Sequence, residues 1–340
     1  MNTDLYQLFD PCLDDADANE ILGVIRSRGP VEMYVGGQAS EGVGEGLFRR
    51  HDAVLNYVKK RIEAGLMEPL DVTAARTNLF RAVFAEPGVR AVSGVSKLLH
   101  HQGLLDAARA LTGRSVVRPH TLYVNILLPG QELAVHTDTP TFRGLTYPAT
   151  PEWFLVVMKH SGLFEEQRIH MAAAVAFFGE CSKGGAFVLY PPGSKRARVS
   201  VPPTHNTAIA LNAIELFHAV ARVGGPEAPA PPAQIGHQLV SAGGESWQLR
   251  SGERIVHSYN ESELRFSLQW KAECFVDSQE VEGVDSGRDS ITVDQAVEVL
   301  KVDLRERGVL GDKELDPTDL ALLMIEHYID FPAGDPCIAS

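Results

Sequence analysis

Nine short runs of β-forming residues between positions 115 and 271 restrict this chain to few folds. Glycine and proline separate the runs, and no series of long helices alternates with them. Short strands at such spacing are typical of antiparallel sandwiches and barrels, whereas a parallel sheet needs a crossover helix after each strand. We therefore predict a mostly β core. Its expected strands are 115–119, 121–128, 171–178, 185–190, 198–201, 207–212, 215–222, 254–258 and 264–271.

Helical patterns flank this core on both sides. Residues 1–114 are expected to form an N-terminal helical region that packs on the core, and 276–340 a C-terminal helical extension. The core, 115–275, contains two expected inserts. The first, 139–170, has a buried helix in its middle, and the second, 224–252, has a proline-rich loop that cannot be a central strand.

The helices of the flanking regions follow from apolar spacing and from capping patterns. Apolar residues at helical spacing predict helices at 53–62, 71–85 and 89–111. In the tail, Thr292 begins a helix with a capping-box pattern, and Pro317 occupies the first position of the last helix.

Charge and composition restrict the partners. The 340 residues include 44 acidic and 31 basic ones, and the resulting net charge of -13 opposes binding to nucleic acid or to an anionic membrane. We expect a small-molecule substrate and a monomer or homodimer. The four cysteines lack CxxC spacing, and neither a leader nor an apolar run of ~18 residues is found, which predicts a cytoplasmic protein with reduced thiols. The glycine-rich stretch 36–46 lacks the lysine of a phosphate-binding loop and is expected to be a flexible surface segment.

A His-x-Asp pair, His136 and Asp138, ends the extended stretch 123–139. Residues at i and i+2 of a strand point to the same side, so the imidazole and the carboxylate can reach one ion together. Such a pair needs a third ligand, and the best candidate is His218 in the strand-like run 215–222. Two histidines and one carboxylate form the metal-binding face of non-haem Fe(II) oxygenases, which leaves coordination positions open.

The last expected strand has two different faces. Arg265, Ser267 and Gln269 alternate with Phe266 and Leu268. A buried arginine inside a barrel is unfavourable unless an anion meets it. A carboxylate co-substrate would do so through two parallel hydrogen bonds.

Taken in order between residues 120 and 272, these elements resemble the iron(II)/2-oxoglutarate-dependent oxygenases. The matching elements are the strand with Tyr123 and Asn125 on one face, the His136-x-Asp138 pair, the GlyGlyAlaPhe strand at 184–187, His218, and Arg265-x-Ser267. The resemblance implies a double-stranded β-helix, a jelly-roll or cupin-like fold, that uses Fe(II), 2-oxoglutarate and O2.

The resemblance also implies roles for these residues. His136, Asp138 and His218 become the catalytic iron ligands, and Arg265 binds the far carboxylate of 2-oxoglutarate with Ser267 as its hydroxyl partner. Tyr123 and Asn125 then face the co-substrate. The 47 positions from His218 to Arg265 exceed the gap common in prolyl-hydroxylase-like members, so the anchor could instead be Arg222, Arg250 or Arg254.

The reaction expected from this resemblance is an oxidation. Halogenating family members replace the metal-binding carboxylate with a small residue, so Asp138 favours hydroxylation, desaturation or cyclisation. The expected substrate is a small metabolite, such as an amino acid or a natural-product intermediate of secondary metabolism, and Arg143 is a candidate for binding its carboxylate. Two alternatives stay open: a cupin-type metal dioxygenase that does not use 2-oxoglutarate, and a non-catalytic binding protein on the same barrel.

Overall fold

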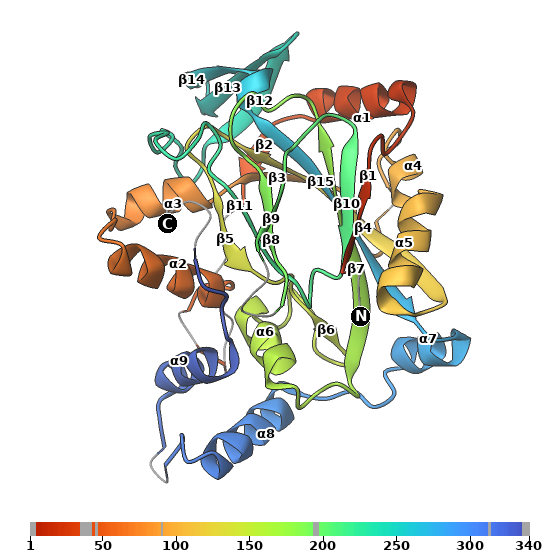
Figure 1. The fold of residues 1–340 in the computed structure, drawn as a ribbon, viewed down its shortest axis with the longest axis vertical. Coiled ribbons are helices and arrows are strands. Elements are labelled where there is room, and N and C mark those ends of the chain that lie inside the picture. Colours follow the sequence, from red (N-terminus) through yellow and green to blue (C-terminus); the bar gives the residue numbers. More distant parts are fainter. Residues whose placement is uncertain are drawn as a thin grey trace.

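The computed structural model describes residues 5–34, 43–44, 47–89, 91–192, 197–311 and 314–334. Two antiparallel sheets face each other, and helices lie outside them and at one end (Figure 1). Within the described residues, no helix has the length and apolar character needed to span a bilayer.

In the described part of the chain the larger sheet has eleven strands, and its paired strands run antiparallel. At its centre the register places Ser267 opposite Asn125 and Gln269 opposite Tyr123. Residues that face each other across an antiparallel pair share a face, so these four side chains point into the same space. β6 (Thr141–Phe142) pairs only with β7 among the described strands. The other ten strands are hydrogen-bonded to their neighbours in the order β1 (Tyr6–Phe9), β10 (Thr207–Leu211), β7 (Arg168–Phe178), β15 (Arg265–Phe275), β4 (Val116–Leu127), β3 (Phe80–Ala85), β2 (Val31–Met33), β12 (Gln238–Gly243), β13 (Ser246–Ser251) and β14 (Arg254–Asn260).

The smaller sheet covers the inner face of the larger one. A hydrophobic cluster between them joins Val175 and Phe177 of the larger sheet to Leu189 and Val220 of the smaller. Its strands, in order, are β5 (Leu133–His136), β11 (Phe217–Val220), β8 (Phe187–Tyr190) and β9 (Val199–Val201). The mostly antiparallel β core expected from the sequence is therefore confirmed.

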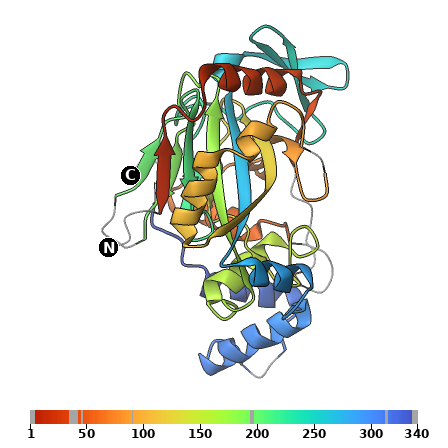
Figure 2. The ribbon, with the colours of Figure 1, turned by 90° about the vertical axis from the view of Figure 1, so that its right-hand side faces the viewer.

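Helices from the N-terminal region cover the outer face of the larger sheet (Figure 2). The alternation on β15 explains this packing. Phe266, Leu268 and Trp270 belong to the outer cluster, and Trp270 Nε1 donates to the carbonyl of Leu99 at 2.8 Å. The polar face of β15 is thereby left to the interior. The covering helices are α1 (Asp15–Ser27), α4 (Ser96–Leu99) and α5 (Gln102–Thr112).

A further hydrophobic cluster lies at the end of the molecule where α6, α8 and α9 meet (Figure 1). The capping box at Thr292 is present, and the side chain of Asp316 caps the helix that Pro317 begins. The helices of this cluster are α6 (Glu152–Ser161), α8 (Val293–Glu306) and α9 (Pro317–Tyr328). In the chain, α7 (Ser278–Asp285) precedes α8. Two further helices, α2 (His51–Glu63) and α3 (Leu70–Thr77), lie beside β5.

Three expectations about secondary structure are wrong. Among the described residues of the predicted helix 89–111, only Ser96–Leu99 and the part from Gln102 onward are helical, as α4 and α5. The predicted helix 71–85 ends at Thr77, and Phe80–Ala85 forms β3 because pairing with β4 and burial of its aromatic residues outweigh the helical spacing. The insert 224–252 is a loop only in its proline-rich half. Its second half forms β12 and β13, which continue the larger sheet from β2. The prediction for the glycine-rich stretch 36–46 lies outside the described residues, apart from Val43 and Gly44.

Candidate metal and co-substrate site

His136 and His218 meet on two neighbouring strands of the smaller sheet, the edge strand β5 and β11 beside it. His136 is the last residue of β5, and the antiparallel register places it opposite His218 of β11. The centroids of the two rings are 4.3 Å apart. Residues opposite each other in such a pair have their side chains on the same face, so both imidazoles point into the barrel.

Asp138 completes this group from the segment that follows β5. Its backbone N–H donates to the carbonyl of Ala213 at 2.8 Å, which fixes the turn out of the strand. Its Oδ1 lies 3.6 Å from His218 Nε2. One ligand atom from each of His136, Asp138 and His218 lies within 4.8 Å of the other two. This spacing suits three ligands around one ion of the 2-His-1-carboxylate type.

Backbone carbonyls fix the orientation of both imidazoles. His136 Nδ1 lies 2.7 Å from the carbonyl oxygen of Ala134, and His218 Nδ1 lies 2.9 Å from that of Leu216. Because a carbonyl only accepts hydrogen bonds, each Nδ1 carries the proton and each Nε2 keeps its lone pair. This is the arrangement that orients histidine for metal binding.

The surroundings of His136 and Asp138 give both residues the protonation states that binding of a cation requires. Burial, followed by the neighbouring His218, holds the pKa of His136 well below its usual value, so the ring is neutral. Burial acts to raise the pKa of Asp138, but Lys271 and the histidines outweigh it and hold this pKa well below the usual range. Asp138 is therefore a carboxylate.

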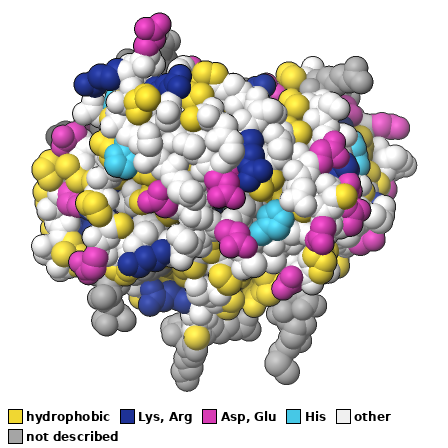
Figure 3. Space-filling view, turned by 90° about the horizontal axis from the view of Figure 1, so that it is seen from above, with side chains coloured by type: hydrophobic (Ala, Val, Ile, Leu, Met, Phe, Trp, Pro, Cys, Tyr) yellow, Lys and Arg dark blue, Asp and Glu magenta, His cyan; other side chains and the backbone are white. Residues whose placement is uncertain are grey.

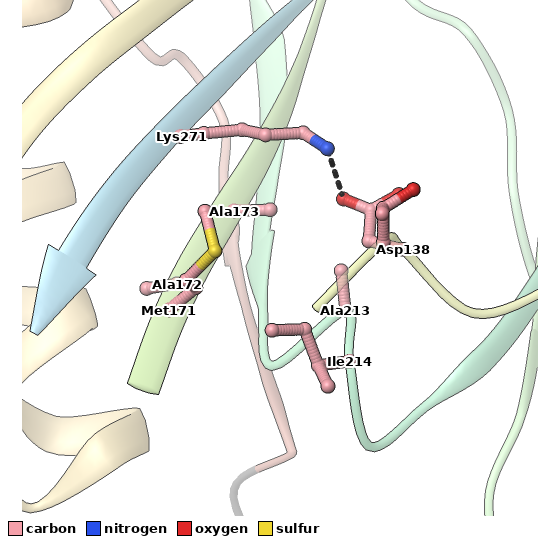
Figure 4. Close-up of a pocket in the computed structure, with 8 residues that line it drawn as sticks. Asp138, Met171, Ala172, Ala173, Ala213, Ile214 and Lys271 are labelled. Atoms are coloured by element: carbon pink, nitrogen blue, oxygen red, sulfur yellow. Dashed lines mark ion pairs between the residues drawn. The ribbon is translucent and has the colours of Figure 1, made fainter. Parts of the chain in front are cut away.

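Lys271 contacts the candidate site, although the sequence analysis does not single it out. Its Nζ lies 3.1 Å from Asp138 Oδ2, the oxygen that does not face His218 (Figure 4). Lys271 has the same strand parity as Arg265, Ser267 and Gln269, and this parity was the available signal. The two charged groups close one side of a small pocket that is partly open to solvent. Apart from them it is lined by Thr139, Met171, Ala172, Ala173, Ala213 and Ile214.

Arg265 is buried in the same barrel, with 1% of its surface exposed. Its Nε donates to the carbonyl of Gly185 at 2.6 Å and its Nη1 to Ser267 Oγ at 2.9 Å. Nη2 has no hydrogen-bond partner among the described residues. Burial lowers the pKa of Arg265 to about 10, and none of the described carboxylates forms an ion pair with it. An unpaired buried guanidinium of this kind fits an anionic ligand.

Gly185 makes room for this arginine. Its φ is +70°, and a Cβ at this position would lie 2.9 Å from Arg265 Cδ. A larger residue would therefore strain the backbone and push the arginine away.

The three alternative anchors have other surroundings. Arg222 forms a buried ion pair with Glu132, Nε to Oε2, at 2.8 Å. Arg250 donates to Gln248 on its own strand, and Arg254 is exposed on β14 at the far edge of the larger sheet. Of the four arginines, Arg265 alone is buried without a carboxylate in the described part of the chain.

Tyr123 and Asn125 face the interior as expected, and they surround an arginine that the sequence interpretation placed in a helix. Arg81 of β3 lies over the Tyr123 ring at 4.1 Å, and its Nε donates to Asn125 Oδ1 at 2.9 Å. The predicted helix 71–85 includes Arg81, and a helix would not place this residue on the inner face of the sheet.

Arg143 lies beside α7. Its Nη1 is 3.2 Å from Asp289 Oδ2, and its Nη2 is 4.0 Å from Glu280 Oε1. Among the described residues, no hydrogen bond or ion pair connects it to the three candidate metal ligands, and its role in substrate binding stays a prediction.

No protein-family model and no curated protein matches the sequence. Several solved structures are similar to it. A prolyl hydroxylase from Trichoplax adhaerens, in complex with a peptide of hypoxia inducible factor, has a TM-score of 0.41 at 11% identity, over 84% of this chain and 87% of that one. A 2OG-Fe(II) oxygenase family member from Burkholderia pseudomallei has 0.39 at 12%, over 79% and 85%. HygX from Streptomyces hygroscopicus, with nickel, 2-oxoglutarate and hygromycin B bound, has 0.34 at 10%, over 79% and 83%. These scores lie below 0.5, so the function is inferred below from this chain's own residues.

Proposed function

We propose that this protein is an Fe(II)- and 2-oxoglutarate-dependent oxygenase whose two sheets form a double-stranded β-helix. The observation that carries the proposal is the convergence of His136, Asp138 and His218 within 4.8 Å, with both imidazoles held by their Nδ1 atoms. Two imidazoles and one carboxylate match the ligand preference of Fe(II) in oxygenases.

The residues present also fit the co-substrate. Arg265 would hold the distal carboxylate of 2-oxoglutarate, with its unpaired Nη2 as a donor and Ser267 as the neighbouring hydroxyl. Tyr123 and Asn125 would border this ligand from β4. When bound, iron and 2-oxoglutarate supply the oxidising chemistry: O2 converts 2-oxoglutarate to succinate and CO2 while a C–H bond of the substrate is oxidised.

The chain's own residues contribute orientation and charge. The carbonyls of Ala134 and Leu216 hold each Nδ1, so that each Nε2 would be free to bind the ion. Lys271 holds the outer oxygen of Asp138, which leaves Oδ1 toward His218. Because Asp138 supplies the carboxylate, hydroxylation, desaturation or cyclisation is favoured over halogenation.

The proposed substrate is a small metabolite, such as an amino acid or a natural-product intermediate. The pocket beside Asp138 is small and mostly apolar, which suits a short aliphatic group next to the ion. Acidic, basic and hydrophobic side chains are interspersed over the face seen in Figure 3, and its described residues do not form the broad basic surface that nucleic acid requires.

Succinate formation tests this proposal. Purified protein with Fe(II), O2 and 2-oxoglutarate labelled at C1 should release labelled CO2 and form succinate in equal amounts. An amino acid or natural-product intermediate that the protein oxidises should increase the rate of succinate formation. Asp138→Ala should abolish both products, whereas His257→Ala on β14 should leave them unchanged. Bound iron without succinate would favour the cupin-type dioxygenase, and the absence of bound iron would favour the binding protein.

A further inference from the structure

Arg81 is held rigidly between two aromatic rings. Its guanidinium carbon lies 3.9 Å from the ring centroid of Tyr34 and 4.1 Å from that of Tyr123. A single hydrogen bond, from Nε to Asn125 Oδ1, fixes the rotation of the guanidinium group in its plane. The two rings and Asn125 therefore occupy much of the space around the guanidinium, and its Nη groups remain to meet a ligand.

This edge belongs to the interior of the barrel. Arg81 is opposite Asn125, and Asn125 is opposite Ser267, so the three side chains share the inner face of the sheet. Tyr34 packs against the hydrophobic cluster between the two sheets. Tyr123 is opposite Gln269, and the next inward position of β15 is Lys271. Arg81 and Lys271 thus border the same space.

The charge of Arg81 is not balanced within the described part of the chain. Most partly buried arginines of this acidic protein have a carboxylate partner, as Arg76 has in Glu68 and Arg168 in Glu215. No described carboxylate lies within 4.0 Å of the Arg81 nitrogens; Glu32, its cross-strand neighbour, is exposed and accepts from Gln238 at 3.4 Å. The Nη groups make no hydrogen bond to the described residues.

We propose that Arg81 binds a carboxylate of the primary substrate, which makes the substrate a small organic acid. Two parallel hydrogen bonds from the edge of the guanidinium suit a planar carboxylate. The apolar part of the acid would extend past Lys271 into the pocket lined by Met171, Ala173 and Ile214. This inference rests on the proposed oxygenase function and assigns to Arg81 the role that the sequence suggested for Arg143.

The test uses butyrate as the acid and butyramide as its neutral match. The protein is loaded with Mn(II) and saturating 2-oxoglutarate, and the relaxation of the ligand's methyl protons by Mn(II) reports binding near the metal. Butyrate should show saturable relaxation and butyramide should not. Arg81→Leu should raise the dissociation constant for butyrate at least tenfold, Arg81→Lys should have an intermediate effect, and Arg250→Leu should have none.

Other outcomes overturn the assignment. Equal binding of butyrate and butyramide, no saturable butyrate signal, or wild-type butyrate affinity in Arg81→Leu would each exclude a carboxylate site at Arg81. Weakened binding of 2-oxoglutarate in Arg81→Leu, with butyrate unaffected, would make Arg81 a co-substrate residue instead. Arg81→Gln, which keeps a planar group near the two rings, is a second variant that can replace Arg81→Leu if the leucine variant misfolds. Failure of the wild-type protein to bind Mn(II) or 2-oxoglutarate would contradict the oxygenase function itself.

Discussion

His136 and His218 are cross-strand partners, opposite each other in the register of β5 and β11, with ring centroids 4.3 Å apart. The two residues are 82 positions apart in the sequence, and strand pairing alone brings them together. The site therefore depends on the smaller sheet as well as on the His-x-Asp pair.

Removing one of these histidines should impair metal binding without unfolding the protein. His218→Ala should lower Co(II) affinity by at least ~100-fold, because even the loss of a residue that only orients a ligand typically costs about 10- to 100-fold. Calorimetric titration with Co(II) measures this, and His257→Ala on β14 is the matched control. Wild-type affinity in His218→Ala would remove this residue from the site.

Arg265→Leu should weaken binding of 2-oxoglutarate. Losing one charged partner in a desolvated site costs roughly 2–5 kcal/mol, or about 30- to several-thousand-fold in affinity. Arg265→Lys should lie between the leucine variant and the wild type, because it keeps the charge without the planar fork. The dissociation constant is measured on the metal-loaded protein, and Arg250→Leu should bind 2-oxoglutarate normally. If Arg265→Leu binds 2-oxoglutarate normally and Arg250→Leu does not, the anchor is Arg250.

Arg222→Leu should affect stability and not 2-oxoglutarate binding. Arg222 is paired with Glu132, which is 1% exposed and also accepts from Tyr57 and Arg61. Removing one member of a buried ion pair typically costs about 3–5 kcal/mol of the free energy of unfolding. Denaturant titration measures the loss. An unchanged stability together with weakened 2-oxoglutarate binding would identify Arg222 as the anchor.

Acid should destabilise the protein partly through His160. Burial, followed by the charge of Lys159, lowers the pKa of His160 to about 3. Between pH ~6.5 and about 3, the unfolded chain binds a proton here that the folded protein does not, so the free energy of unfolding falls as the pH falls, by at most ~1.4 kcal/mol per pH unit. Above pH ~6.5 this contribution is fully present. His120 and His170, lowered to about 4, act in the same direction.

His160→Phe should therefore flatten the dependence of stability on pH. The comparison is the slope of the free energy of unfolding between pH 4 and 6 in the variant and in the wild type, with His257→Phe as control. A slope equal to that of the wild type would show that His160 takes up a proton in the folded state.

The sequence predicted the parts of this structure that rest on local patterns. The alternation on β15 separates Arg265 and Ser267 from Phe266 and Leu268, and this separation is what the structure shows. The capping box at Thr292 was equally legible, because both of its hydrogen bonds lie within four residues. The His136-x-Asp138 pair shares a face for the same local reason.

The parts that were missed depend on tertiary pairing. Phe80–Ala85 continues a helical pattern, yet it forms β3 because β4 offers an unpaired edge. That error hid Arg81, whose surroundings come from Tyr34 and Tyr123 on other strands. Lys271 could have been noticed from parity alone, but its contact with Asp138 depends on the approach of the two sheets.

Anaerobic titration of the Fe(II)-loaded protein with 2-oxoglutarate tests the proposed function most directly, because chelation of the iron by the keto acid produces a weak metal-to-ligand charge-transfer absorption band before any substrate is known. The wild-type protein should develop this band in a saturable manner at one 2-oxoglutarate per iron. Arg265→Leu should require far more 2-oxoglutarate to reach the same band, and His218→Ala should show none. A protein that binds iron through His136, Asp138 and His218 but develops no band at saturating 2-oxoglutarate would contradict the proposed function.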